Sequence, residues 1–345
     1  MEILVPAAGL STRYPNMRPK YLLYDYKGEL MLKNAVAPFI GTEHNITVGI
    51  LREHADEFNA LEHIKNAIPN ANVIIFDERT KGPADTIFQM LKWFGDEDFD
   101  FLVKDCDSFF DHKVFTGRVN YICVSNIADH ETLTRLSSKS FVKCNDQDII
   151  TDIIEKQVVS DTFCVGGYKF ESANLFKQTY LSIYENIREV FVSHVIQKML
   201  MNGKTFTISP VSNYVDVGTF AEWEAYNDKP VIFCDIDGTL IKAQSRFGDY
   251  NYESDPIPLK ENVKKIREYF DKGAQVFFVT AREPIYHKET DAMLQKLGFK
   301  DAFLIMGLNN AARILINDYN EANPHPRAIA YNIKRDSDNL KDIMR

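Results

Sequence analysis

The chain has 345 residues, of which 45% are hydrophobic and 26% charged, and its formal net charge is −9. This composition is typical of globular proteins with substantial cores, and the length favours two domains. The acidic balance, without any Lys/Arg block, argues against nucleic acid as a partner. No apolar stretch approaches the roughly 20 residues that a membrane span needs.

The cysteines and the N-terminal segment indicate the cellular compartment of the protein. Five cysteines are scattered without a C-x-x-C pair, which favours reduced, mostly buried thiols over disulfides or a zinc site. The N-terminal segment MEILVPAAGL lacks a basic start and is too short for a signal peptide. We therefore expect a cytoplasmic protein.

Short β-rich runs alternate with amphipathic segments from the N-terminus onward. A helix is expected in residues 54–68 (HADEFNALEHIKNAI), with Phe58, Leu61 and Ile64 on one face. This alternation predicts an α/β domain with a largely parallel sheet. The expected strands are residues 2–8, 46–51, 72–76, 100–105 and 121–125.

A second alternating series begins at residue 230. The polar segment YNDKP, residues 226–230, marks the boundary before it, so we expect one domain at residues 1–227 and another at residues 228–345. The expected elements of the second series are the strand in PVIFCDIDGTL, a helix in 259–273, a strand in 274–281, a helix around 288–298 and a strand in 313–319.

The first expected strand runs directly into PAAGLSTRYPNMRPKYLL. Ala8, Gly9 and Ser11 permit a tight loop whose backbone N–H groups bind phosphates. Arg13 and Lys20 add positive charge for a polyphosphate. The stretch resembles the G-x-[GS]-T-R…P-K signature of sugar-phosphate nucleotidyltransferases, and the resemblance implies that the loop binds a nucleoside triphosphate.

Further segments match landmarks of this family in the same order. Thr80–Thr86 (TKGPADT) looks like the base-contacting loop, where Gly82 lets the backbone approach the nucleobase. FLVKDCDSFF looks like the metal-binding strand end, with Asp107 as ligand and Asp105 beside the nucleotide. NYVDVGTFAEW looks like the second metal site, with Asp216 as ligand.

The segment IIEKQVVSDTFCVGGYKF looks like the acceptor site of the same family. Glu155 and Lys156 would face the acceptor, and Gly167, next to Gly166, would permit close approach. Seen alone, the Glu155–Lys156 pair would be read as a solvated ion pair. The shared order of all these segments favours the functional interpretation.

The resemblance also implies a reaction. A phosphate oxygen of the acceptor attacks the α-phosphorus of a nucleoside triphosphate, and pyrophosphate leaves. Mg²⁺ held by Asp107 and Asp216 would offset the repulsion between the two polyanions. Arg13 would stabilise the pyrophosphate, and Lys20 the α-phosphate and the acceptor phosphate.

The size of the domain and its aromatic residues bear on which nucleotide base and which acceptor the enzyme would use. The compact domain, without an added β-helix, resembles the phosphocholine and sugar-phosphate cytidylyltransferases more than the larger uridylyl- and adenylyltransferases. This resemblance implies CTP, with UTP, dTTP and GTP as alternatives. No aromatic cage for choline is identified, so a sugar or polyol phosphate is favoured over phosphocholine. CDP-activated sugars and alditols are precursors of capsule-type surface glycans, so the resemblance implies a role in surface-glycan synthesis. A nucleotide sensor without turnover stays open, as does a glycosyltransferase with Asp105-x-Asp107 as its D-x-D motif.

The stretch VIFCDIDGTL ends an apolar run with Asp235 and Asp237, and it resembles the D-x-D-G-T motif of haloacid-dehalogenase-type phosphohydrolases. The resemblance implies Asp235 as nucleophile and Asp237 as general acid/base. Thr280, after the next strand, would bind phosphate. Mg²⁺ would be held by Asp235, by the backbone carbonyl of Asp237 and by Asp318.

Two departures from the haloacid-dehalogenase pattern concern the end of the chain. Asn317-Asp318 offers one acid where many relatives have two, and no lysine stands plainly before that strand, so Arg313 or Lys300 would substitute in binding phosphate. An inert domain that serves assembly is the alternative. The short segments around the motifs leave no room for a substantial cap.

We therefore expect a bifunctional enzyme with two α/β domains. The N-terminal domain would be nucleotide-diphospho-sugar-transferase-like (Rossmann-like) with a mixed sheet, and the C-terminal domain haloacid-dehalogenase-like and Rossmannoid, without a large cap. Its partners would be a nucleoside triphosphate and a phosphorylated sugar or polyol, with Mg²⁺ as cofactor and neither nucleic acid nor membrane as a partner. Homo-oligomerisation is left open.

Overall fold

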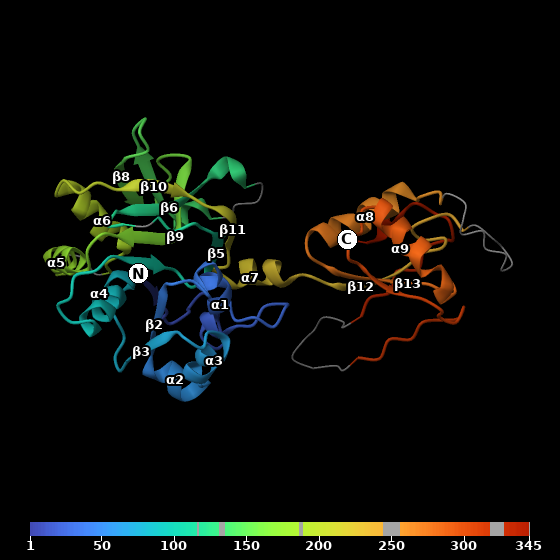
Figure 1. Cartoon of the computed structure of the whole chain (residues 1–345), viewed down its shortest axis with the longest axis horizontal. Helices are drawn as coiled ribbons and strands as arrows, with labels where there is room; N and C mark the ends of the chain where they lie inside the picture. The colour runs from blue at the N-terminus through green and yellow to red at the C-terminus, as the bar shows by residue number, and fades with distance from the viewer. Residues whose placement is uncertain (116, 131–134, 186–188, 244–255, 318–327, 345) are drawn as a thin grey trace. The chain divides into compact units, whose positions relative to one another are not determined.

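The computed structural model describes the whole chain except residues 116, 131–134, 186–188, 244–255, 318–327 and 345. The described residues form two compact units, Met1–Asn227 (unit 1) and Asp228–Arg345 (unit 2). Both units combine helices with a sheet (Figure 1), which confirms the predicted α/β class. None of the helices described here is long and apolar enough to cross a bilayer.

The strands of unit 1 form a nine-stranded mixed sheet and a separate two-stranded antiparallel sheet, β11-β5. They are β1 (Glu2–Pro6), β2 (Asn45–Leu51), β3 (Asn72–Phe76), β4 (Phe101–Lys104), β5 (Ser108–Asp111), β6 (Tyr121–Asn126), β7 (Ser140–Cys144), β8 (Ile150–Glu155), β9 (Thr162–Phe170), β10 (Thr207–Pro210) and β11 (Ser212–Asp216). The main path of the sheet runs β10-β6-β9-β4-β1-β2-β3, with the antiparallel pair β7-β8 attached to β9. The β1-β2, β1-β4 and β2-β3 pairs are parallel, and β9 is antiparallel to β4 and β6. The sheet is therefore mixed, as predicted: β9 runs antiparallel to its neighbours, and the β10-β6 pair beyond it is again parallel.

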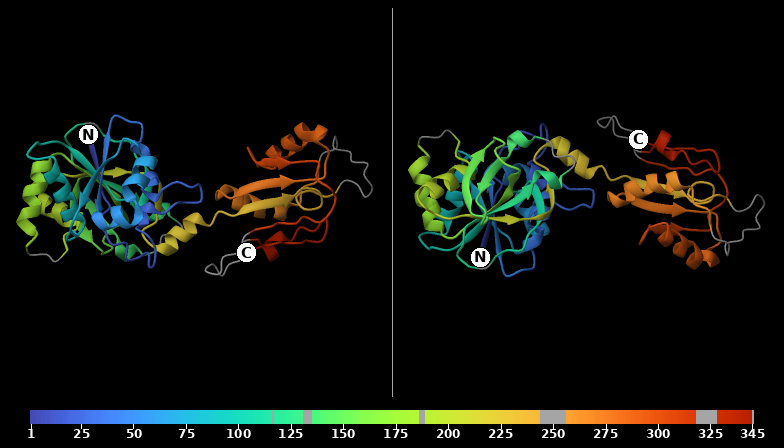
Figure 2. Two further views of the ribbon diagram at one scale, coloured as in Figure 1. Left: turned by 90° about the horizontal axis from the view of Figure 1, so that it is seen from below. Right: turned by 90° about the horizontal axis from the view of Figure 1, so that it is seen from above.

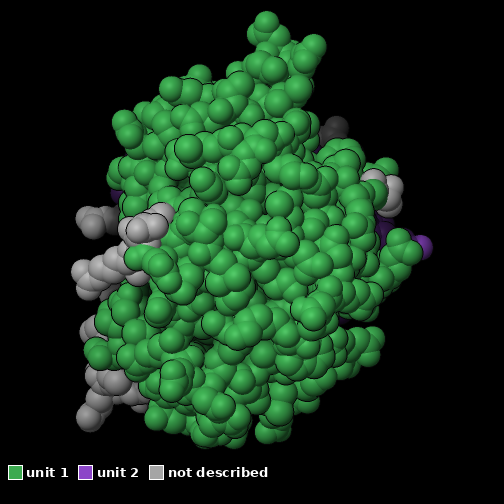
Figure 3. Space-filling model, turned by 90° about the vertical axis from the view of Figure 1, so that its left-hand side faces the viewer, with its two compact units in different colours: residues 1–227 green, residues 228–345 purple. Residues whose placement is uncertain are grey.

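Helices cover both faces of this sheet. They are α1 (Met31–Val36), α2 (Arg52–Phe58), α3 (Ala60–Ala67), α4 (Pro83–Trp93), α5 (Ala173–Ile183), α6 (Val192–Met201) and α7 (Phe220–Asn227), with short 3-10 turns at Lys20–Leu22, Ala37–Phe39, Ile127–Asp129 and Leu136–Ser138. Successive side chains of a strand point to opposite faces. Leu4 accordingly packs in a core with α4, α5 and α6, whereas Ile3 and Val5 pack in another core with α1 and α3. Figure 2 shows the two groups of helices on either side of the strands, and Figure 3 shows the close packing over one side of unit 1.

The helix predicted over residues 54–68 is divided in two. Asn59 adopts a left-handed backbone conformation with φ 49°, and its N–H donates to the carbonyl of His54, which ends α2. Helix α3 begins at the next residue. Asparagine tolerates this conformation better than most residues, so a single position separates two helices within one amphipathic pattern.

Unit 2 contains a three-stranded parallel sheet in the order β12-β13-β14. Its elements are β12 (Val231–Asp235), α8 (Lys260–Asp271), β13 (Gln275–Val279), a 3-10 turn (Pro284–Tyr286), α9 (His287–Lys296), β14 (Phe303–Ile305) and α10 (Leu340–Ile343). A core that includes Cys234, Phe278 and Leu294 joins the sheet to the helices. All five cysteines of the chain are free, and four of them are buried.

The predicted strand over residues 313–319 is wrong for its described part. Residues 313–317 have no strand structure, and Ile314 and Ile316 are 82% and 91% exposed. The third strand is β14, which the sequence pattern did not predict. A strand exists only where a neighbour completes its hydrogen bonds, and β12 to β14 pair with one another rather than with residues 313–317.

Candidate active sites

A cleft of about 1050 Å³ opens in unit 1 where the chain leaves the carboxyl ends of β1 and β4. This edge is where open α/β sheets bind their ligands. Of the predicted residues of unit 1, all of which are described, only Gly167 lies outside the lining. The predicted residues that line the cleft are Ala8, Gly9, Ser11, Arg13, Lys20, Gly82, Asp105, Asp107, Glu155, Lys156 and Asp216.

The loop after β1 is fixed through Ser11. This residue adopts a left-handed conformation with φ 51°, and its carbonyl accepts a hydrogen bond from the N–H of Tyr14 at 2.8 Å. Its hydroxyl accepts from the N–H of Lys20 at 3.0 Å. Ser11 thus ties the small-residue loop to the backbone of the lysine that contributes charge to the cleft.

Asp107 is held by both predicted cations. The ammonium of Lys20 donates to its carboxylate, and Arg13 Nη2 lies 3.4 Å from Oδ2. Burial alone would raise the pKa of Asp107, but the charges of Lys20 and Arg13 outweigh burial and hold this pKa well below its ordinary value. Asp107 is therefore a carboxylate throughout the neutral range.

Asp105, two residues before Asp107, has a pKa shifted in the opposite direction. Burial and the negative charge of Asp107 raise the pKa of Asp105 to about 6. Its N–H donates to the carbonyl of Gly166 at 2.8 Å. A Cβ on Gly166, whose φ is +84°, would lie 2.6 Å from Asp105 Oδ2, so this position needs glycine. A Cβ on Gly167 would instead lie 2.7 Å from Cys123 Sγ, which shows that Gly167 serves the packing of β9 on β6.

The antiparallel pair of β5 and β11 brings Asp216 to Asp107. Asp216 pairs with Ser108 in this two-stranded sheet, and the N–H of Val217 donates to the carbonyl of Asp107 at 3.0 Å. The Cβ position of Gly218 lies 3.1 Å from Asp216 Oδ1 and 3.4 Å from Asp107 Oδ2. The space beside Gly218 is therefore shared by the two carboxylates and by Arg13, whose Nη1 lies 3.3 Å from the same position.

The donors around this space fit Mg²⁺. A hard divalent cation prefers carboxylate and phosphate oxygens, and it commonly takes only one or two carboxylates from the protein. Within the described residues, no three His, Cys, Asp or Glu side chains converge as a complete metal cage. Asp107 and Asp216 would therefore share the ion with phosphate oxygens of a bound nucleotide.

The acceptor segment presents Glu155 and Lys156 in distinct ways. Glu155 Oε2 accepts hydrogen bonds from the hydroxyls of Ser140 and Ser193, the latter at 2.7 Å. Lys156 has a left-handed backbone with φ 57°, and its Nζ lies 4.1 Å from the ring centroid of Phe191. The two side chains therefore do not form the solvated ion pair that the bare dipeptide would suggest.

Sequence reasoning missed one lysine that lines this cleft and a second that bonds to two of its lining residues. Lys139 lines it and pairs with Asp216, but no motif in SSKSF marks this lysine. Lys104, at the end of β4, is fully buried and donates to the carbonyls of Asp105 and Ser108 at 2.8 and 2.7 Å. Burial lowers the pKa of Lys104 to about 8. A lysine inside the apolar run before Asp105 was the available signal for it.

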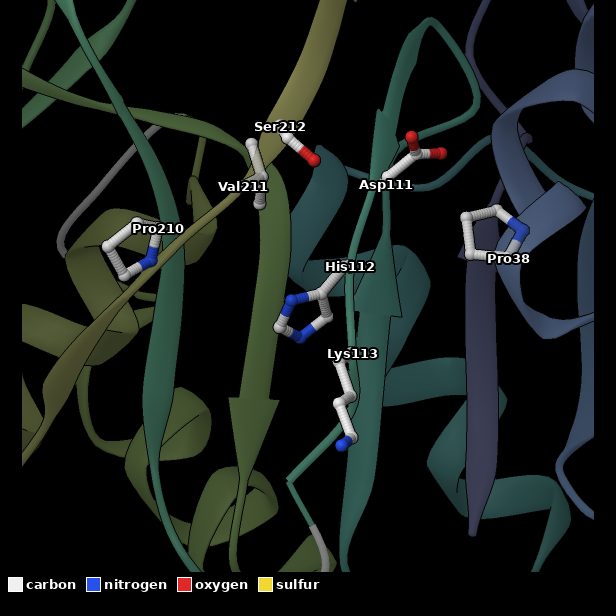
Figure 4. Close-up of a pocket in the computed structure, with 7 residues that line it drawn as sticks. All are labelled: Pro38, Asp111, His112, Lys113, Pro210, Val211 and Ser212. Atoms are coloured by element: carbon white, nitrogen blue, oxygen red, sulfur yellow. The ribbon is translucent and has the colours of Figure 1, made fainter.

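A second hollow of unit 1, of about 640 Å³, lies away from these residues (Figure 4). Figure 4 shows Pro38 on one side of it and residues 210–212 on the other, with His112 between them. His112 Nε2 lies 3.0 Å from the hydroxyl of Tyr121, and burial lowers the pKa of His112 to about 4. His112 is therefore neutral at pH 7, and none of the predicted site residues lines this hollow.

The site of unit 2 gathers at the carboxyl end of β12. Asp235 ends this strand, and its carboxylate receives Arg313 Nη2 at 2.9 Å and the hydroxyl of Thr239 at 3.2 Å. Burial raises the pKa of Asp235, against the opposing charge of Arg313. The predicted nucleophile and the predicted phosphate-binding arginine are thus in direct contact.

Asp237 is held by Arg282, a residue that sequence reasoning missed. Arg282 Nε and Nη2 donate to the two carboxylate oxygens at 2.8 and 2.7 Å, and its Nη1 lies 3.3 Å from the hydroxyl of Thr290 in α9. Thr280, which is buried, lies 3.3 Å from Asp237 Oδ2 through its own hydroxyl. The position of Arg282, two residues after Thr280 at the same strand end, was the available signal.

The predicted metal set of unit 2 is described only in part. Asp318, its third member, lies outside the described residues. Asp235 and Asp237 are present at the strand end, and each is paired with an arginine. The described residues therefore provide two of the three groups that the resemblance assigns to Mg²⁺.

The comparisons agree with this division of the chain. Residues 232–342 match the haloacid dehalogenase-like hydrolase family. The fold resembles that of the nucleoside-diphosphate-sugar pyrophosphorylase from Vibrio cholerae RC9, with 17% identity, TM-score 0.55, and coverage of 65% of this chain and 98% of that chain. It also resembles the inositol-1-phosphate CTP transferase from T. maritima, with 19% identity, TM-score 0.52, and coverage of 64% and 90%.

No curated protein matches the sequence. The solved relatives cover the N-terminal part of the chain, so unit 1 has the nucleotidyltransferase fold and unit 2 is haloacid dehalogenase-like. The resemblances predicted from the sequence are confirmed at this level.

Proposed function

We propose that the chain is a bifunctional enzyme of surface-glycan precursor synthesis. Residues 1–227 transfer a nucleotidyl group, with CTP favoured, to a sugar or polyol phosphate and release pyrophosphate. Residues 228–345 form a phosphatase with an aspartyl nucleophile. Mg²⁺ dependence and a cytoplasmic location belong to the same proposal.

One observation carries the transferase. The cleft of unit 1 brings two carboxylates, Asp107 and Asp216, to one position beside Gly218, with Lys20 and Arg13 on the first of them. In-line transfer between two polyanions requires positive charge and positioning more than a side-chain nucleophile. The likeness to a structure named as a CTP transferase supports the choice of base.

The cleft residues of unit 1 bind different groups of the two substrates during nucleotidyl transfer. Backbone N–H groups of residues 8–11 bind the triphosphate, and Arg13 stabilises the negative charge that develops on the pyrophosphate. Lys20 binds the α-phosphate while the acceptor oxygen forms its bond to the α-phosphorus and the bond to pyrophosphate breaks. A bound Mg²⁺ would offset the repulsion between the two substrates. Glu155, anchored by two serines, accepts hydroxyl groups of the acceptor.

The residues of unit 2 support a two-step hydrolysis. Asp235 forms a bond to phosphorus, and the leaving oxygen takes a proton from the carboxyl group of Asp237. Water then attacks the aspartyl phosphate, returns a proton to Asp237 and releases phosphate. Thr280 and Arg313 bind the phosphoryl oxygens. Arg282 orients Asp237 through both carboxylate oxygens.

Pyrophosphate release tests the transferase. The purified protein with Mg²⁺ is given CTP, UTP, dTTP, GTP or ATP, each with sugar phosphates, polyol phosphates and phosphocholine. We expect turnover with CTP and a sugar or polyol phosphate, and its loss in Asp107→Asn. Turnover with another base would correct the base, and a folded protein that binds nucleotide but releases no pyrophosphate with any pair would refute the transferase.

Phosphate release tests unit 2. We expect Asp235→Asn to abolish hydrolysis of phosphate monoesters and to leave pyrophosphate release from unit 1 unchanged. If Asp235→Asn changes no measured activity, unit 2 is an inert module that serves assembly, and the phosphatase half of the proposal is wrong.

A further inference from the structure

Lys139 is a cation of the unit 1 cleft to which no role has been assigned. It precedes β7 and lines the cleft, yet only 8% of its side chain is exposed. Its ammonium pairs with Asp216 and lies 2.8 Å from the hydroxyl of Tyr214. The rings of Phe163 and Tyr214 lie 5.4 and 5.2 Å from Nζ and enclose it.

The backbone places Lys139 beside the acceptor segment. The N–H of Lys156 donates to the carbonyl of Lys139 at 3.0 Å, and the next residue, Ser140, donates its hydroxyl to Glu155. Lys20 and Arg13, in contrast, lie at Asp107, at the end of the loop that follows β1. Lys139 therefore belongs to the acceptor side of the cleft rather than to its triphosphate side.

A largely buried ammonium needs an anion close by, because an unpaired charge in such a site is strongly disfavoured. In the protein without ligands, that anion is Asp216. Asp216 is also one of the two carboxylates that fit a divalent cation. Lys139 holds its Oδ2, whereas Oδ1 lies on the side of Gly218, so a divalent cation at Oδ1 would repel the ammonium and weaken its pairing with Asp216. Occupancy of Asp216 by a divalent cation leaves Lys139 in need of another anion.

We propose that Lys139 binds the phosphate of the acceptor, and that it exchanges Asp216 for this phosphate when a divalent cation takes Asp216. The inference rests on the proposed function, since it assigns Lys139 to the acceptor side of the same cleft. The ligand class is a phosphate monoester, whose dianion replaces the carboxylate as partner of the ammonium. The exchange makes divalent cation and acceptor phosphate bind cooperatively.

The test measures binding and needs no turnover, so it stays informative if the transferase reaction itself is refuted. Mn²⁺ affinity is measured by electron paramagnetic resonance, and inorganic phosphate affinity by calorimetry with and without Mn²⁺. In the wild type we expect Mn²⁺ to strengthen phosphate binding about tenfold, within the range of common couplings. In Lys139→Met we expect tighter Mn²⁺ binding and loss of most of this coupling.

Two controls separate the exchange from general electrostatics and from misfolding. Lys143→Met removes an exposed lysine of the same strand and should leave both affinities unchanged. Lys139→Arg keeps the charge and should retain part of the coupling. Thermal unfolding of each variant shows whether unit 1 is folded.

A second route frees Lys139 without any metal. Asp216→Asn removes the competing charge, so it should bind inorganic phosphate in metal-free buffer as tightly as the wild type does with Mn²⁺. The double variant Asp216→Asn/Lys139→Met should lose this gain. Equal phosphate affinity in the single and double variants, or unchanged coupling in a folded Lys139→Met, would overturn the proposal.

Discussion

In both units, nearby cations balance the negative charges of two aspartates, but the cations differ. Unit 1 pairs Asp107 with Lys20 and the more distant Arg13, and Asp216 with Lys139, whereas unit 2 pairs Asp235 with Arg313 and Asp237 with Arg282. Lysine presents a compact point charge that other cations can replace. Arginine presents a planar fork that fixes the orientation of a carboxylate. The proposed exchange in unit 1 therefore uses the lysine at Asp216, whereas in unit 2 the fork of Arg282 fixes the orientation of Asp237.

The largest expected effect separates the two activities. Lys20→Met should lower pyrophosphate release about a thousandfold, because it removes the cation at Asp107 and at the α-phosphate. Phosphate release by unit 2 should stay within about twofold, since mutations without shared partners act independently. Parallel assays of both products check this. Equal loss of both activities would show that the two sites do not act separately.

Arg282→Lys tests whether the arginine fork serves proton transfer. With an alkyl phosphate, whose leaving oxygen needs a proton, we expect a loss of about a hundredfold in kcat. With p-nitrophenyl phosphate, whose leaving group needs none, the loss should be only a few-fold. Lys296→Gln, on an exposed position of α9, serves as control. Equal losses with both substrates would assign Arg282 to packing alone.

Asn262 provides a test of stability confined to unit 2. This fully buried residue of α8 donates through Nδ2 to the carbonyls of Thr239 and Ser337 at 2.8 Å, and accepts from the N–H of Leu340. Asn262→Ala should lower the free energy of unfolding of unit 2 by about 2 kcal/mol, because these buried backbone groups lose their partner. Calorimetry should show one transition shifted and the transition of unit 1 unchanged.

The smallest expected effect concerns pH and unit 1. The pKa of His112 is lowered from 6.5 to about 4 by burial, so between these values the unfolded chain binds more protons than the folded one. Stability is therefore lost as pH falls from about 6.5 towards 4. His112→Asn should reduce this loss, as measured by chemical denaturation at pH 7 and pH 5. An unchanged pH dependence would show that His112 does not contribute to it.

Local patterns in the sequence were sufficient for much of the fold. The strands β1, β3, β4, β12 and β13 and the helix α8 fall within predicted segments, and β2, β6 and α9 extend one residue beyond theirs. The errors in the predicted elements occur where the backbone conformation of one residue, or the absence of a neighbouring strand, determines the local structure. Asn59 adopts a left-handed conformation that separates α2 from α3. Residues 313–317 pair with none of the described strands. Neither event alters the apolar periodicity from which the elements were predicted.

The same distinction applies to the sites. The order of the motifs determined which residues belong together, and 11 of the 12 residues predicted for unit 1 line one cleft. Their partners came only from the tertiary structure. Lys139 and Asp216 are 77 positions apart, and Arg282 and Asp237 are 45 apart. A motif identifies the residues that a reaction requires. The counterion of a charged residue is determined only by the tertiary structure, because sheets and loops bring distant segments of the chain together.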